Sequence, residues 1–165
     1  MVKEKIVERV EIQAFDFRCL QELKKLDSRI HLGFLTEADN EIPGPSDFNH
    51  PDPQIASMWT GGALLKNYNK SIPQMIKSLA GDNPACWEPE DVELTKEALD
   101  EAHKLGLKVV VWTWPEHSGT TFDPKMIERL INWGVDGIIT DDPGHLISLL
   151  AARGFQLPIH FVFNK

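Results

Sequence analysis

Short runs of alternating hydrophobic and polar residues are followed, several times along the chain, by longer runs with helical periodicity. The clearest strand is Leu107–Thr113, which is rich in β-branched residues; such runs are typical of parallel strands buried on both faces. The predicted strands are Val10–Phe15, Ile30–Leu35, Ala85–Trp87, Leu107–Thr113 and Gly137–Asp141. This alternation predicts an α/β fold of five βα units.

Helix starts and stops are marked by polar caps and by glycines. The N-cap candidates are Asp16, Ser71, Asp123 and Asp142, a further helix is predicted over Thr95–Leu105, and the stops are Gly81, Gly106 and Gly134. The apolar positions expected to face the sheet are Leu20, Leu23 and Leu26; Met75, Ile76 and Leu79; Ala98, Leu99, Ala102 and Leu105; Met126, Ile127, Leu130 and Ile131; Leu146, Ile147, Leu149 and Leu150. Each helix is therefore predicted to pack on the sheet along one stripe.

Two architectures fit five such units. With 165 residues, each unit has about 33, close to the roughly 31 of a (β/α)8 barrel. A flavodoxin-like doubly wound sheet also closes at this length. Barrel strands carry interior residues of mixed polarity near their C-terminal ends, as Gln13 with Phe15 and Val110 with Trp112 do. We therefore expect a partial (β/α)8 barrel, with the doubly wound sheet as the alternative.

Charge and hydropathy exclude several classes of function. The formal net charge is −8, which argues against binding to nucleic acid or to an anionic membrane surface. The longest uninterrupted apolar runs, Val109–Trp112 and Leu149–Ala152, are far shorter than the ~18 residues of a membrane span. The charged start shows no apolar signal segment, so the expected location is the cytoplasm. Cys19 and Cys86 have no CxxC spacing and are expected to be buried free thiols.

Catalytic groups in parallel α/β folds lie where the strands end. Asp16 and Asp142 are explained as helix caps, which leaves Asp141 as the better candidate for a site. No phosphate-binding glycine motif is present, and no histidine pair has metal-ligand spacing. His50 and His117, in loops after strands, are the candidates for acid–base chemistry. The proline-rich segment Thr36–Pro53 is a candidate lid, with a plain surface insertion as the alternative.

Three runs of the chain together resemble one enzyme family. The runs are Val10–Asp16, Ala102–Thr113 and Gly134–Pro143, and they are similar to the patterns "QSFD", "AH..GL.V..WT.N" and "GVDGIITD.P" in the C-terminal part of glycerophosphodiester phosphodiesterases. The resemblance implies that residues 1–154 form the last five βα units of a (β/α)8 barrel. Residues 155–165 have no counterpart and are expected to form an apolar tail that covers an edge or an end of the barrel.

The resemblance also implies a reaction: hydrolysis of glycerophosphodiesters to glycerol 3-phosphate and an alcohol, in lipid metabolism. That family uses an early "HRG", a Glu-x-Asp pair, an "HD" and a later Glu-x-Lys to place two histidines and a Ca²⁺ or Mg²⁺ ion. This ordered set does not occur in the sequence. We therefore expect about three units to be absent, no catalytic residue or metal in this chain alone, and no activity of its own.

The substrate-binding residues carried over from the resemblance are Gln13, Phe15 and Trp112, on the glycerol side of the pocket, with Asp141 at a further strand end. Phe15 and Trp112 are predicted to meet at the C-terminal rim of the barrel. Unpaired edges are expected at Val10–Phe15 and Gly137–Asp141, so the chain is predicted to self-associate or to pair with the missing part. A non-catalytic module that completes its barrel with another chain is the alternative.

Overall fold

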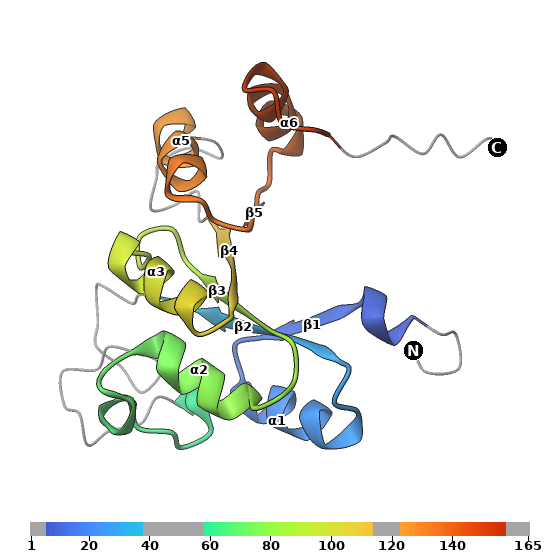
Figure 1. Cartoon of the computed structure of the whole chain (residues 1–165), viewed down its shortest axis with the longest axis vertical. Coiled ribbons are helices and arrows are strands. Elements are labelled where there is room, and N and C mark those ends of the chain that lie inside the picture. Colours follow the sequence, from blue (N-terminus) through green and yellow to red (C-terminus); the bar gives the residue numbers. More distant parts are fainter. Residues whose placement is uncertain (1–5, 38–57, 114–122, 158–165) are drawn as a thin grey trace.

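The computed structural model of the chain describes residues 6–37, 58–113 and 123–157 (Figure 1). Its strands are β1 (Glu11–Ala14), β2 (His31–Thr36), β3 (Ala85–Pro89), β4 (Lys108–Trp112) and β5 (Gly137–Ile139). Its helices are α1 (Phe17–Leu26), α2 (Ile72–Ala80), α3 (Lys96–Lys104), α5 (Pro124–Trp133) and α6 (Pro143–Ala152). Three short 3₁₀ turns, Val7–Arg9, Met58–Thr60 and Leu65–Tyr68, precede β1 and α2. The predicted five βα units are confirmed.

Four of the five described helices begin at the predicted cap, and α3 begins one residue later than predicted, with Thr95 as its cap. The side chains of Asp16, Ser71, Thr95, Asp123 and Asp142 accept hydrogen bonds from backbone N–H groups two or three residues ahead, which satisfies donors that a helix start leaves open. Gly134 ends α5 at a φ of 86°, a left-handed conformation that glycine adopts without strain. The capping side chains therefore set the residue at which each of these helices begins, and Gly134 sets the residue at which α5 ends.

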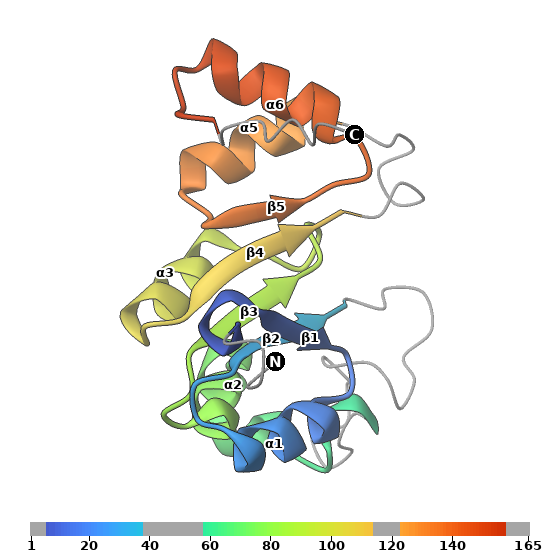
Figure 2. The same ribbon diagram turned by 90° about the vertical axis from the view of Figure 1, so that its right-hand side faces the viewer.

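The sheet is built in chain order, β1-β2-β3-β4-β5, and every pairing is parallel. A doubly wound sheet reverses its strand order at a switch point, and this sheet contains no reversal. The strands curl into half a barrel, with α2, α3 and α5 behind them in Figure 2. The doubly wound alternative is therefore wrong, and the expectation of a partial barrel is confirmed.

The register separates two faces of the sheet. Leu32, Phe34, Trp87, Val109 and Val111 point toward the helices, and each is at most 1% exposed. This convex face, which the helices cover, holds the hydrophobic core. The opposite, concave face carries Glu11 and Gln13 from β1, Gly33 from β2, Cys86 and Glu88 from β3, and Lys108, Val110 and Trp112 from β4.

Both ends of the sheet are open within the described residues. There β1 pairs only with β2, and β5 pairs only with β4. The predicted edges are confirmed, while self-association remains a prediction. None of the described helices is long and apolar enough to cross a bilayer.

Several finer expectations are wrong, and others concern residues outside the described ranges. Leu26, predicted to face the sheet, is 78% exposed because it ends α1 beyond the sheet contact. Cys19 is exposed, whereas Cys86 is buried as predicted. Strand β3 runs on through Pro89, and β5 ends at Ile139. Most of the candidate lid, His50, His117 and most of the tail lie outside the described residues.

Candidate functional site

Two aromatic rings meet at the C-terminal ends of the strands. The ring centroids of Phe15, just after β1, and Trp112, the last residue of β4, lie 5.8 Å apart with the rings perpendicular. In a flat sheet, strands three positions apart are separated by about 14 Å. The contact therefore follows from the curl of the sheet, and the predicted meeting of the two rings is confirmed.

The indole of Trp112 is fixed by two backbone acceptors. Its Nε1 donates to Thr36 O at 3.2 Å and to Glu88 O at 3.1 Å, at the ends of β2 and β3. Trp112 is only 9% exposed, whereas Phe15 is half-buried. Trp112 thus spans the strand ends as a rigid support, and Phe15 offers more of the accessible ring surface. We call this pair the aromatic rim.

The other two substrate-binding candidates lie apart from the ring contact. Gln13 is exposed on the concave face, two residues below Phe15 on the same strand. Asp141 is exposed two residues beyond β5. The structure thus brings two of the four candidates into contact, and a role in substrate binding remains a prediction for all four.

A second group of polar side chains lies below the aromatic rim on the concave face. Glu11, Cys86 and Glu88 each offer a potential metal-ligand atom, and these atoms all lie within 4.8 Å of one another. Glu11 and Glu88 come from strands separated by β2. A β-carbon built on Gly33 would lie 2.6 Å from Glu88 Oε1, so the carboxyl group occupies the space that this glycine leaves over β2. The missing side chain at Gly33 allows the two glutamates to meet.

Burial and like charge act on this cluster in the same direction. Glu88 is 1% exposed, and its Oε2 has no hydrogen-bond partner in the described structure. Burial, with an added contribution from the hydrogen bond and charge of Glu11, raises the pKa of Glu88 to about 8. Burial also raises the pKa of the Cys86 thiol, and the charges of Glu11 and Glu88 add to that effect.

Sequence reasoning did not assemble this cluster. Alternation already placed Glu11 on the same face as Gln13 and Phe15. The predicted strand Ala85–Trp87 ends before Glu88, whereas β3 continues through Pro89. Extending that strand by two residues places Cys86 and Glu88 on one face, which is the signal that could have revealed the cluster.

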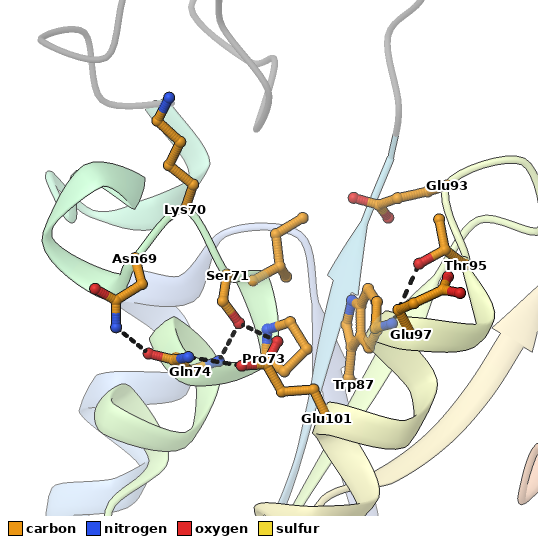
Figure 3. Close-up of a pocket in the computed structure, with 12 residues that line it drawn as sticks. Asn69, Lys70, Ser71, Pro73, Gln74, Trp87, Glu93, Thr95, Glu97 and Glu101 are labelled. Carbon is orange, nitrogen blue, oxygen red and sulfur yellow. Dashed lines mark hydrogen bonds between the residues drawn. The ribbon is translucent and has the colours of Figure 1, made fainter.

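A cavity of about 450 Å³ lies on the other side of the sheet, between the first turns of α2 and α3 (Figure 3). Glu101 closes one end, where its carboxylate accepts hydrogen bonds from Ser71 Oγ at 2.8 Å and Gln74 Nε2 at 2.6 Å. Glu93 and Glu97 lie across the cavity beside the indole of Trp87. These groups make the cavity predominantly acidic, and it is separate from the aromatic rim.

The spellings that the resemblance implies for Ca²⁺ or Mg²⁺ are only partly present: Glu37–Ala38–Asp39 reads Glu-x-Asp, and Glu37 directly follows β2, but Asp39 lies outside the described residues. Glu22 and Lys24 give a Glu-x-Lys spelling, but they lie on α1. Glu22 is paired there with Lys25 at 2.6 Å, and Lys24 donates to Leu79 O at 2.9 Å. These side chains therefore do not fit the ion of the resembled family.

Known proteins match most of the chain. The model of the glycerophosphoryl diester phosphodiesterase family matches residues 3–145. A glycerophosphodiester phosphodiesterase from Caldanaerobacter subterraneus subsp. tengcongensis is 25% identical over 147 residues, which cover 89% of this chain and 44% of that protein.

Two solved structures share the fold. One, from Silicibacter pomeroyi DSS-3 and assigned as a glycerophosphoryl diester phosphodiesterase, has a TM-score of 0.66 and 27% identity, and the match covers 95% of this chain and 43% of that one. Another, from Galdieria sulphuraria, has a TM-score of 0.60 and 21% identity over 91% of this chain and 47% of that one, and it supports the fold alone. The chain spans less than half the length of these proteins. With the family model matching most of its length, the chain belongs to the glycerophosphoryl diester phosphodiesterase family.

Proposed function

We propose that this chain supplies the substrate-binding rim of a phosphodiesterase barrel that hydrolyses glycerophosphodiesters to glycerol 3-phosphate and an alcohol. The observation that carries the proposal is the Phe15–Trp112 contact at the C-terminal ends of the strands. Barrel enzymes bind substrate at this end. Membership of the family supports the class of reaction.

Within the rim, each side chain has a role suited to a small polyol. The accessible ring of Phe15 forms an apolar wall for the glycerol backbone, and Trp112 holds that ring in place. Gln13 and Asp141 supply polar groups for hydroxyl contacts on either side. The phosphate group of the substrate would be bound by the part of the barrel that lies outside these five units.

These 165 residues alone are expected to be inactive. The proposed hydrolysis needs an acid and a base beside the scissile phosphodiester, and the family is generally metal-dependent. Of the three described histidines, only His145 follows the end of a strand closely, and its Nδ1 bonds to the cap Asp142 at 2.5 Å. His103 bonds instead to Asp136 at 2.9 Å, before β5 begins. The described residues therefore offer one histidine near a strand end and no second one beside it, and the assay below tests whether His50 and His117, which lie outside them, change that expectation.

The test joins this chain to the part of the Silicibacter pomeroyi protein that it leaves uncovered. Glycerophosphocholine hydrolysis is assayed with Ca²⁺ or Mg²⁺ and with EDTA, for the joined protein and for the 165 residues alone. We expect activity in the former, and turnover above ~1 s⁻¹ by the latter would contradict the proposal. In the joined protein, Phe15→Ala should raise KM, and Phe155→Ala, an exposed control ring, should not.

The open edges of β1 and β5 favour a second candidate, a binding module that completes its barrel with a different chain. Sedimentation distinguishes the two. A joined protein that remains inactive although folded, together with a defined complex between this chain and another protein, would favour the module.

A further inference from the structure

We propose that Glu11, Cys86 and Glu88 form a Zn²⁺ site on the concave face, in addition to any ion used for hydrolysis. The three ligand atoms lie within 4.8 Å of one another. Tetrahedral Zn²⁺ binds oxygen and sulfur at about 2.0–2.3 Å, which places its ligand atoms roughly 3.3–3.8 Å apart. Small rotamer changes of the two glutamates bring the cluster to that spacing. The site does not depend on the proposed hydrolytic function.

The strongest sign of a missing ligand is Glu88. A carboxyl group that is 1% exposed should have its oxygens satisfied, yet Glu88 Oε2 has no hydrogen-bond partner in the described structure. The Glu88 carboxyl group lies beside a second carboxyl group and a thiol, and both become anions when deprotonated. A bound cation would satisfy this oxygen and balance the charge of all three groups.

Among the described residues, acidic side chains outnumber cationic ones around the cluster. Lys108, which pairs with Cys86 in the β3–β4 register and interacts with it electrostatically, donates its hydrogen bond to Asp136 Oδ1 at 2.7 Å. The acidic side chains that act on Cys86 are Glu11, Glu88 and Asp136. One lysine that is already paired with an aspartate therefore leaves most of this negative charge unbalanced.

The ligand types select the ion. Mg²⁺ and Ca²⁺ prefer sites made entirely of oxygen, whereas a thiolate with two carboxylates suits Zn²⁺ and its spectroscopic substitute Co²⁺. Three protein ligands leave a fourth position for water. Because Glu11 is on β1 and the other two ligands are on β3, the ion would tie two strands that do not pair through their backbones.

The experiment uses the 165-residue chain, freed of metal with chelator and titrated with Zn²⁺ and with Co²⁺. Calorimetry is expected to give one Zn²⁺ per chain, with Ca²⁺ and Mg²⁺ unable to displace it. Co²⁺ should produce a thiolate-to-metal charge-transfer band in the near ultraviolet. Zn²⁺ should also raise the thermal unfolding temperature.

The two cysteines provide a matched pair of variants. Cys86→Ser should abolish the charge-transfer band, whereas Cys19→Ser, which changes an exposed thiol, should keep it. Glu11→Gln, at an exposed position that folding tolerates, should weaken Zn²⁺ binding by at least about tenfold, since even outer-shell partners contribute 10–100-fold. Glu22→Gln on α1 is its matched control.

Several results would overturn the proposal. If Co²⁺ gives no charge-transfer band in the folded chain, the cluster is a proton-sharing carboxyl pair and not a metal site. The proposal also fails if Cys86→Ser and Glu11→Gln both leave Zn²⁺ affinity unchanged, because the ion then binds elsewhere. Neither result depends on phosphodiesterase activity.

Discussion

The two faces of one curved sheet differ in the side chains that they carry and in how closely these are packed. The convex face is an apolar layer with the helices packed on it, where Phe34 is fully buried against Phe17 at a centroid distance of 4.9 Å. The concave face holds charged and polar side chains, a buried thiol and a glycine gap. The helix-covered face thus stabilises the fold, whereas the concave face carries the side chains that can bind ligands or react.

Removing a large convex side chain tests this comparison most strongly. Phe34→Ala is expected to lower the free energy of unfolding by about 3–5 kcal/mol, because it leaves a cavity in a closely packed layer. Val110→Ala, a half-buried change on the concave face, should cost about 1 kcal/mol. Denaturant unfolding with an unchanged m-value measures both. Equal losses would remove the distinction between the faces.

The glycine gap gives the largest expected effect on the concave face. Gly33→Ala places a methyl group 2.6 Å from Glu88 Oε1 and 2.9 Å from Gln13 Cβ, so it should destabilise the chain by about 1–3 kcal/mol. The same change combined with Glu88→Ala should cost less than the sum of the two single changes, because the contact with Glu88 has gone and only the one with Gln13 Cβ remains. A double-mutant cycle of unfolding free energies measures this coupling, and additive costs would contradict it.

Asp136 links the starts of β4 and β5, and its contribution should depend on pH. Partial burial raises the pKa of its carboxyl group, but hydrogen bonds from Lys108, the Val109 N–H and His103 together outweigh burial and hold the pKa below its usual value. A lowered folded-state pKa stabilises the fold above the ordinary aspartate pKa, and the stabilisation is lost as the pH falls through the folded-state value.

Asp136→Asn should therefore cost about 1 kcal/mol at pH 7, in line with charged hydrogen bonds at a partly exposed site. The difference from the parent chain should disappear in strong acid. Urea unfolding at a series of pH values checks this, with the exposed Asp82→Asn as control. A difference that stays constant down to the lowest pH would show that the charge of Asp136 contributes nothing.

The smallest effect is expected at Leu26, outside both faces. Its side chain is 78% exposed, so Leu26→Lys should change the unfolding free energy by no more than about 0.5 kcal/mol. Leu20→Ala on the same helix, fully buried, should cost about 2–5 kcal/mol. Thermal unfolding of both variants checks the contrast, and a large loss at Leu26 would mean that an undescribed segment or a second copy covers it.

The features that could be predicted from sequence are those set by local chemistry. Caps such as Asp16 and Ser71 compete for only a few nearby donors, so their role follows from spacing alone. The Phe15–Trp112 contact was also predictable, because alternation together with barrel closure brings strand ends to one mouth. The caps need no knowledge of packing partners distant in the sequence, whereas the ring contact also needs the expectation of a barrel.

The features that escaped prediction depend on what the sheet brings together. Periodicity assigns Leu26 to the apolar stripe of α1, but it does not show that the sheet contact ends before the last turn of that helix. The Glu11–Glu88 contact needs β1 and β3 to approach each other over a glycine on β2, and alternation gives the face on which each glutamate lies but not that approach. These outcomes follow from tertiary packing alone.

The chain-order arrangement of the strands also has a consequence for the time course of folding. Paired residues are separated by about 20–55 positions along the chain, as in Glu11↔His31 and Leu32↔Ala85, and each new strand adds to the edge left by the one before it. A ribosome delivers residues in that same order. The first three strands and α1 and α2 can therefore assemble while the last two strands are still being translated, so a nascent chain paused after α3 should already protect the amides of β2 from hydrogen exchange.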